Sequence, residues 1–251
     1  MLAKTIIGIS ILCLGVQASS IDRIRMLTDH WPPYNIVTDG KLSGISVELY
    51  ELMLKMNNSK TRRKDFKITS WKATYDSAKF VNHNAALTMT RNKIREKDFK
   101  WVGPIDTKTS GLISKKSKGI RIKSAKDLSR HSIAVVKGYS THQMLKKAGL
   151  RKNLVVTGGL FAVYNAMRKL ADDQVDIYST SNINYIMKMF DTHSFDASKF
   201  EVIKKYKSDS LYFAFNIQTD DKTIAKLQNS LDQLKKDGTY QKIKSKYLRY
   251  K

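Results

Sequence analysis

The stretch from Thr88 to Arg95 combines residue types that together can bind a carboxylate group. An apolar run over residues 85–89 predicts a strand, Thr90 follows it, and Arg95 lies a short distance further along the chain. A guanidinium is a planar fork that matches both oxygens of a carboxylate, and threonine hydroxyls and backbone N–H groups at a strand end supply further donors. The alternative interpretation is that Arg91 and Arg95 are solvated surface charges, which is the usual situation of arginine.

The other residue types that carry out chemistry in proteins do not form a convergent set. The histidines show no metal-ligand spacing, and no nucleophile is paired with a base. Glu48 could act as a general acid, but a glutamate at a predicted helix start is usually a partner of the helix dipole. We therefore expect a protein that is not an enzyme and that uses no metal and no cofactor. The histidines are His30, His83, His131, His142 and His193.

The first eighteen residues are typical of a signal peptide. Lys4 precedes an apolar run over residues 6–16, and Val16-Gln17-Ala18 places small or medium side chains where a signal peptidase cleaves. We expect cleavage after Ala18 and a periplasmic protein. An uncleaved membrane anchor is the alternative, but the run is only about half of the roughly 20 residues that span a bilayer.

Cys13 is the only cysteine of the chain and lies in this predicted leader. A lipoprotein signal needs a small residue before the cysteine, and Leu12 stands there. The predicted mature chain has no cysteine, which excludes disulfides, thiolate nucleophiles and zinc–thiolate sites.

The charge of the chain is strongly positive, with 46 lysines and arginines against 22 acidic residues and a formal net charge of +24. Such an excess first suggests nucleic acid or an anionic surface as a partner. The basic residues are spread along the chain without a run of five or more. We therefore expect a cationic surface that faces anionic envelope lipids or sugars, and no binding of nucleic acid.

The elements around the candidate carboxylate site alternate between strand and helix. The predicted strands are residues 24–27, 66–68 and 85–89, and the predicted helices are residues 46–57 and 71–81. This order indicates a mainly parallel sheet covered by helices.

A second unit of the same kind follows. Its predicted strands are residues 112–115, 132–136, 154–157 and 175–178, alternating with helices that end near residues 148, 171 and 190. Residues 200–206 and 211–217 are predicted as two further strands, and two helices close the chain, the first ending at Gly238.

Seven segments in order resemble the periplasmic solute-binding proteins of the polar amino-acid family, which is bacterial extracellular solute-binding protein family 3 with the type II periplasmic binding fold. The resemblance covers essentially the whole predicted mature chain. It is carried by Thr28-Asp29-x-Trp31-x-Pro33-Tyr34, the glycine-led helix start at Gly44, Trp71, Thr88-x-Thr90 with Arg95 and Phe99, Lys137-Gly138 before Ser140-Thr141, Val175-Asp176, and the run from Leu234 to Tyr240.

The resemblance implies an α/β protein of two lobes joined by two crossing strands, with the ligand in the cleft between them. Lobe 1 comprises residues 19–108 and returns as residues 208–251 with the C-terminal helices, and lobe 2 comprises residues 109–207. It further implies a monomer whose partners are a small-molecule ligand, either an amino acid or a related small acid, and an ABC permease at the inner membrane. The crossing strands are expected to act as a hinge that closes on the ligand.

The resemblance also implies the ligand-binding residues. Arg95 is the expected carboxylate fork, with Thr88 and Thr90 as supporting donors, and Trp31 and Trp71 are the expected faces around the rest of the ligand. The full expected set is Asp29, Trp31, Tyr34, Trp71, Thr88, Thr90, Arg95, Gly138, Ser140, Thr141 and Ser181.

One departure from the family pattern concerns the ammonium group of an amino acid. Family members that bind amino acids usually place an aspartate where this chain has Ser181, and Asp29 is the remaining candidate for an anionic partner. The expected function is therefore periplasmic binding of a small polar solute that carries a carboxylate, with acidic or uncharged polar ligands favoured over cationic ones. The alternatives are an exported ligand-sensing module for a membrane partner and a dehydratase-like enzyme on the same fold.

Overall fold

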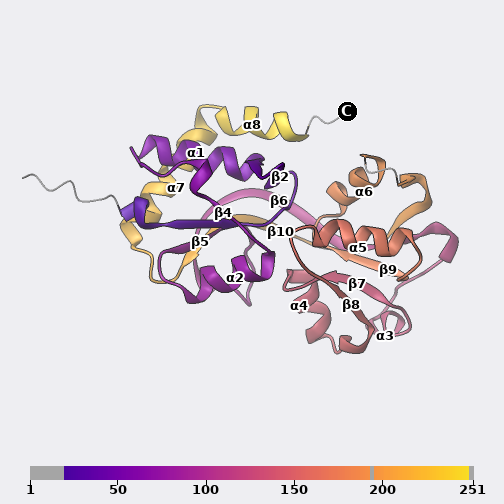
Figure 1. Cartoon of the computed structure of the whole chain (residues 1–251). Coiled ribbons are helices and arrows are strands. Elements are labelled where there is room, and N and C mark those ends of the chain that lie inside the picture. Colours follow the sequence, from indigo (N-terminus) through magenta and orange to yellow (C-terminus); the bar gives the residue numbers. More distant parts are fainter. Residues whose placement is uncertain (1–19, 193–194, 249–251) are drawn as a thin grey trace, which may run out of the picture.

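The computed structural model describes residues 20–192 and 195–248 of the 251-residue chain. The predicted signal peptide with Cys13 lies outside the described residues, as does His193. Figure 1 shows two α/β lobes connected by two long strands, so the two-lobed α/β fold predicted from the sequence is confirmed. Among the described helices, none combines the length and the apolar composition that a membrane span requires.

Lobe 1 contains the N-terminal elements and the two last helices. α1, α7 and α8 pack together on one side of its sheet, and α2 packs against β5 and β1 on the other (Figure 1). The elements are β1 (Arg25–Thr28), β2 (Ile36–Thr38), β3 (Lys41–Ser43), α1 (Ile45–Met56), β4 (Lys67–Ile68), α2 (Trp71–Phe80), β5 (Asn84–Thr90), α7 (Asp221–Lys236) and α8 (Thr239–Leu248). The short β2–β3 hairpin was not predicted from the sequence.

Lobe 2 repeats the alternation of strand and helix. α5 packs on β7, β8 and β9, and α4 packs on β7 and β9. The elements are α3 (Ala125–Leu128), β7 (Ile133–Val136), α4 (Ser140–Lys147), β8 (Leu154–Thr157), α5 (Ala162–Ala171), β9 (Ile177–Thr180) and α6 (Ile183–Thr192).

In the described part of the chain, one eight-stranded sheet runs through both lobes in the order β4-β1-β5-β10-β6-β9-β7-β8, in which β6 is Phe99–Lys115 and β10 is Phe200–Asn216. Within each lobe the outer pairs are parallel: β1 with β4 and β5, and β7 with β8 and β9. The three central pairs are antiparallel: β5 with β10, β10 with β6, and β6 with β9.

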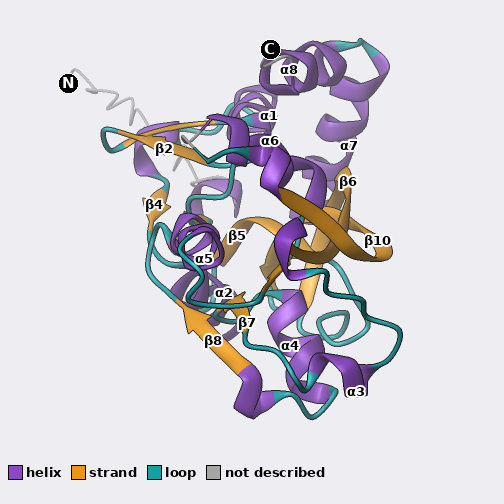
Figure 2. Ribbon diagram, turned by 90° about the vertical axis from the view of Figure 1, so that its right-hand side faces the viewer, coloured by secondary structure: helices purple, strands orange, loops and turns teal. Residues whose placement is uncertain are grey.

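The two strands that join the lobes are longer than the sequence predicted. β6 (Phe99–Lys115) and β10 (Phe200–Asn216) pair along most of their length, side by side in Figure 2. The prediction of separate strands at residues 200–206 and 211–217 was therefore wrong, as was the start of the crossing strand at residue 112. The polar stretch between the two predicted strands is typical of a turn, but its backbone groups pair with β6 through irregular register.

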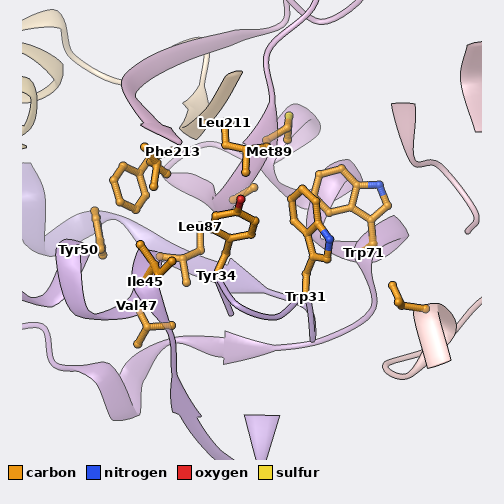
Figure 3. Packing of buried hydrophobic residues seen from close by; sticks show 14 of the residues in the cluster. Trp31, Tyr34, Ile45, Val47, Tyr50, Trp71, Leu87, Met89, Leu211 and Phe213 are labelled. Carbon is orange, nitrogen blue, oxygen red and sulfur yellow. The ribbon is translucent and has the colours of Figure 1, made fainter. Parts of the chain in front are cut away.

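Buried hydrophobic residues form a cluster that includes side chains from both lobes. The residues labelled in Figure 3 belong to its lobe 1 part, in which Tyr50, Phe213 and Val47 lie at one end and the indoles of Trp31 and Trp71 at the other. Tyr139 of lobe 2 belongs to the same cluster. The two lobes are therefore in direct contact at the aromatic end of the lobe 1 core.

Candidate functional site

The expected site residues meet where strands of both lobes end. A small cavity of about 10 Å³ lies there, with room for roughly one water molecule. Its lobe 1 wall consists of Thr90 at the end of β5 and of three residues that follow β1, β4 or β5. Its lobe 2 wall consists of three residues that follow β7 or β9. Ligands of open α/β sheets bind at such carboxyl ends of strands. The lining residues are Trp31, Trp71, Thr90 and Arg95 from lobe 1 and Tyr139, Ser140 and Ser181 from lobe 2.

Arg95 is the buried cation of this cavity, with 1% of its surface exposed. Its guanidinium donates to the Thr90 carbonyl at 3.2 Å, to the Gly138 carbonyl of lobe 2 at 3.0 Å and to the Gln143 amide oxygen at 3.4 Å. The rings of Trp71 and Tyr75 lie 5.4 and 5.2 Å from its central carbon.

The partners of Arg95 do not balance its charge. Among the described residues no carboxylate is hydrogen-bonded to the guanidinium, and its buried Nε has no hydrogen-bond partner there. Burial lowers the pKa of Arg95 to about 10, an effect that Tyr75 and the more distant charge of Asp209 oppose. A buried cation that is held only by neutral oxygens is the arrangement that an anionic ligand would stabilise.

Arg91 has a different environment, although both arginines had been candidates. Its guanidinium forms an ion pair with Glu96, with the Nε donating at 2.8 Å, and it lies over the ring of Tyr212. Its side chain is more than a third exposed. Arg91 is thus a partnered surface charge, the alternative interpretation considered for both.

Trp71 is brought to the cavity by the start of α2. Ser70 caps this helix, because its hydroxyl accepts the Ala73 N–H at 3.4 Å, and Trp71 is the first helical residue after the end of β4. The indole is 5% exposed, and its Nε1 has no hydrogen-bond partner among the described residues. A second buried donor beside Arg95 is therefore unsatisfied.

Tyr139 is the residue of the cavity that the sequence analysis did not propose. Its side chain is 6% exposed and lies against the rings of Trp31 and Trp71, at centroid distances of 5.8 and 5.6 Å. Its hydroxyl donates to Asp29 Oδ2 at 3.1 Å. The only sequence signal was an aromatic residue between the glycine and the serine of the predicted helix start.

Asp29 contacts lobe 2 through this hydrogen bond. The carboxyl is buried, and burial raises its pKa to about 6, while the hydrogen bond from Tyr139 acts in the opposite direction. Asp29 does not line the cavity, so it could pair with a ligand cation only if Tyr139 moved away.

The remaining expected residues of lobe 2 lie at the start of α4 and the end of β9. Ser140 and Ser181 line the cavity, whereas Thr141 is buried beneath it with its hydroxyl 3.4 Å from the Ser179 carbonyl. Gly138 has a φ of 79°, a left-handed conformation that glycine adopts without strain, and its carbonyl faces Arg95.

Tyr34 and Thr88 lie behind the cavity rather than in its wall. The Tyr34 hydroxyl donates to Asp106 at 3.2 Å. The Thr88 hydroxyl lies 2.7 Å from both Asn35 Oδ1 and the Ser46 hydroxyl. The Tyr34 ring packs against Trp31, and neither Tyr34 nor Thr88 lines the cavity.

Lys108 is a second buried cation near the site that the sequence analysis missed. It lies on β6 with no exposed side-chain surface, and its Nζ contacts the Ser110 hydroxyl at 2.9 Å and Asp209 of β10 at 3.4 Å. Burial lowers the pKa of Lys108 to about 8. Asp209 acts to raise this pKa, and the positive charge of Arg95 acts to lower it further. The strands that join the lobes therefore place a buried lysine–aspartate pair close enough to Arg95 for the two cations to affect each other.

The described residues contain no group of three or more potential ligands that could hold a metal ion. Glu48, the general-acid candidate, lies at the start of α1, where it pairs with Lys246 at 2.6 Å and is also hydrogen-bonded to Tyr247. Burial acts to raise the pKa of Glu48, but these partners lower it. A carboxyl held ionised in this way is poorly suited to donate a proton.

Comparison with known proteins identifies the family. The model of the bacterial extracellular solute-binding proteins, family 3, matches residues 24–250, so the chain belongs to this family, and the resemblance read from its motifs is confirmed. A search of curated protein sequences finds no significant match.

Several solved structures share the fold. A histidine kinase sensor domain with similarity to periplasmic binding proteins has a TM-score of 0.76 at 19% identity, covering 90% of this chain and 96% of that one. An ancestral arginine-binding protein bound to glutamine has a TM-score of 0.74 at 22% identity, with 89% and 96% covered. The solute receptor for L-cysteine of Neisseria gonorrhoeae has a TM-score of 0.73 at 16% identity, with 91% of each chain covered.

Proposed function

We propose that this protein binds a small polar solute carrying a carboxylate group in the periplasm and delivers it, as a monomer, to an ABC permease of the inner membrane. The observation that carries the proposal is Arg95, a buried arginine between the lobes whose hydrogen-bond acceptors among the described residues are neutral oxygens. A carboxylate would replace these acceptors by a bidentate charge-assisted pair, which is the stronger interaction.

The groups around Arg95 support a ligand with an anionic end. Ser140 begins α4, so the first N–H groups of this helix, which carry partial positive charge, lie on the lobe 2 side of the cavity. By the family resemblance, Ser181 stands where members that bind amino acids usually place an aspartate, and a hydroxyl does not neutralise an ammonium. Acidic and uncharged polar solutes are therefore favoured over arginine or lysine.

A second candidate function is ligand sensing for a membrane partner. The likeness to a histidine kinase sensor domain favours it, and such a module would use the same cleft. The two candidates are separated by deleting the gene and measuring uptake of the radiolabelled solute. Uptake is lost if the protein serves transport and is kept if it serves sensing.

The proposal is tested by a thermal-shift screen of the chain from Ser19 onwards against amino acids, dicarboxylates and other small organic anions. We expect stabilisation by at least one small carboxylate, which mass spectrometry then recovers unchanged. A screen in which no carboxylate shifts the melting temperature contradicts the proposal, as does conversion of the bound solute.

A further inference from the structure

The Gly138–Tyr139 segment of lobe 2 engages the lobe 1 groups that the proposed solute would use. Arg95 Nη2 donates to the Gly138 carbonyl at 3.0 Å, where the proposed function places a carboxylate oxygen. The Tyr139 ring packs against the indoles of Trp31 and Trp71, the edge-on contact with Trp71 having an interplanar angle of 89°. The phenol hydroxyl donates to Asp29.

The local backbone holds this segment in place. Gly138 has a left-handed φ, its N–H donates to His142 Nδ1 at 2.9 Å, and the Tyr139 N–H donates to the Val136 carbonyl at 3.1 Å. A Cβ added at Gly138 would meet the Trp71 indole at 3.4 Å, so the segment is closely packed on the lobe 1 aromatics.

The segment presents its chemical groups in a defined order. A carbonyl oxygen faces the guanidinium, the Tyr139 backbone nitrogen, Cα and Cβ follow, and an aromatic ring with a terminal hydroxyl completes the series. A free molecule with the same order of groups is an aryl alkanoate such as 3-(4-hydroxyphenyl)propanoate, which is one chain atom shorter. It also lacks an ammonium group, in keeping with Ser181.

We propose that the Gly138–Tyr139 segment is the resident occupant of the solute cleft, and that the solute which replaces it is a small aromatic carboxylate with a hydrogen-bonding group at the far end of its ring. The proposal rests on the proposed function, because it assigns a ligand class to the same cleft. Arg95 binds the carboxylate, Trp31 and Trp71 enclose the ring, and Asp29 accepts from the terminal hydroxyl.

This arrangement makes Tyr139 a determinant of affinity. A solute gains access only in the fraction of molecules in which the segment has withdrawn, and the apparent dissociation constant rises as that fraction falls. Removing the Tyr139 side chain should therefore strengthen binding. If Tyr139 instead served as an ordinary wall of the ligand site, the same change would weaken binding.

The first experiment tests, without any assumption about the solute, whether the space that the Tyr139 ring fills beside Trp31 and Trp71 can bind a free phenol. Tyr139→Ala leaves a space shaped for a tyrosine side chain, and p-cresol is that side chain as a free molecule. We expect p-cresol to raise the melting temperature of Tyr139→Ala and to leave wild type and Tyr206→Ala unchanged. Tyr206 is a matched control, since it is a half-buried tyrosine of lobe 2 that packs on a separate cluster. Equal responses of all three proteins overturn the proposal.

The second experiment tests the ligand class by calorimetric titration with 3-(4-hydroxyphenyl)propanoate. Tyr139→Ala should bind it at least about tenfold more tightly than wild type, since the competing segment has lost its ring. Tyr206→Ala should match wild type. Weaker or equal binding by Tyr139→Ala overturns the role of Tyr139.

Two further comparisons keep the outcomes distinct. Tyr139→Phe keeps the ring and loses only the hydrogen bond to Asp29, so it replaces the alanine variant if that variant does not fold. It should bind the probe more tightly than wild type, by a smaller factor than Tyr139→Ala. Saturable binding of an aliphatic amino acid or dicarboxylate, with no binding of the aromatic probe to any variant, overturns the ligand class while the proposed function stands. Failure of every carboxylate overturns the proposed function itself.

Discussion

Two arginines four positions apart in the sequence have opposite environments, and this difference decides which of them can bind a solute. Arg95 is buried between the lobes without a carboxylate partner among the described residues, whereas Arg91 is partly exposed and paired with Glu96. Sequence alone favoured Arg95 through the family resemblance only. The composition around the two residues is similarly polar, and burial depends on where the other lobe packs.

Arg95→Ala should therefore weaken solute binding on the order of 2–5 kcal/mol, the effect of removing one partner of a buried charge pair. Arg91→Ala should have little effect, because its charge is already paired at the surface. Titration calorimetry of both variants with the best solute from the screen measures the difference. Equal small effects from the two variants would place the ligand elsewhere.

Asp29 should make stability depend on pH in a recognisable direction. Burial raises its pKa from 3.8 to about 6, so the folded protein binds this proton more tightly than the unfolded chain. The stabilisation is complete below the unfolded pKa of 3.8 and is lost as the pH rises through about 6.

The unfolding free energy of wild type minus that of Asp29→Asn should thus fall as the pH rises from 4 to 7. The expected fall is on the order of 2–3 kcal/mol, at 1.36 kcal/mol per pKa unit. Urea denaturation of both proteins across this range gives the difference, in which the titrations of other residues cancel. A difference that is constant or that rises with pH contradicts the assignment.

At the scale of elements, the sequence predicted the alternating pattern well and the joining strands poorly. β8 at Leu154–Thr157 and β5 at Asn84–Thr90 are dense apolar or threonine-rich runs bounded by polar residues, and both were predicted within a residue. β6 contains Gly103-Pro104 and several charged residues, which are typical of loops. Its pairing with β10, distant in sequence, makes it a strand, and local composition does not report such pairing.

The residues of the site also divide into those that local sequence predicts and those that it does not. The cavity is lined by residues at or just after strand ends that stand in recognisable motifs, namely Trp31, Trp71, Thr90, Ser140 and Ser181. The positions of Tyr139 and Lys108 depend on how the lobes meet and how β6 pairs with β10. No local pattern carries that information.

The joining strands also carry a charge pair with a testable asymmetry. Lys108 is fully buried, while its partner Asp209 keeps about a third of its side-chain surface exposed. Asp209→Asn leaves a buried cation without its carboxylate, and removing one partner of a buried pair costs roughly 3–5 kcal/mol, with the exposure of Asp209 reducing the value. Lys108→Met removes the charge and keeps the apolar length of the side chain.

Asp209→Asn should therefore destabilise the protein more than Lys108→Met. Urea denaturation of both variants at pH 7 tests the order. The reverse order would show that Lys108 is stabilised by interactions other than its pair with Asp209.

At the scale of the whole molecule, the contact between the two lobes includes the groups that we assign to the solute. The bonds from Arg95 to Gly138 and from Tyr139 to Asp29 each connect lobe 1 to lobe 2. A cavity of about 10 Å³ admits little more than a water molecule, so a solute enters only when the lobes separate. Separation requires these bonds to open, and the strands β6 and β10 are the elements about which the lobes would turn.

Arg95 is proposed to receive a solute carboxylate between the lobes. A crystal structure of the protein grown with the best solute from the screen tests this binding mode. We expect the carboxylate within about 3 Å of the Arg95 guanidinium, with both oxygens paired, and the Gly138 carbonyl released from it. A solute bound elsewhere, with Arg95 still donating to Gly138, would contradict the claim.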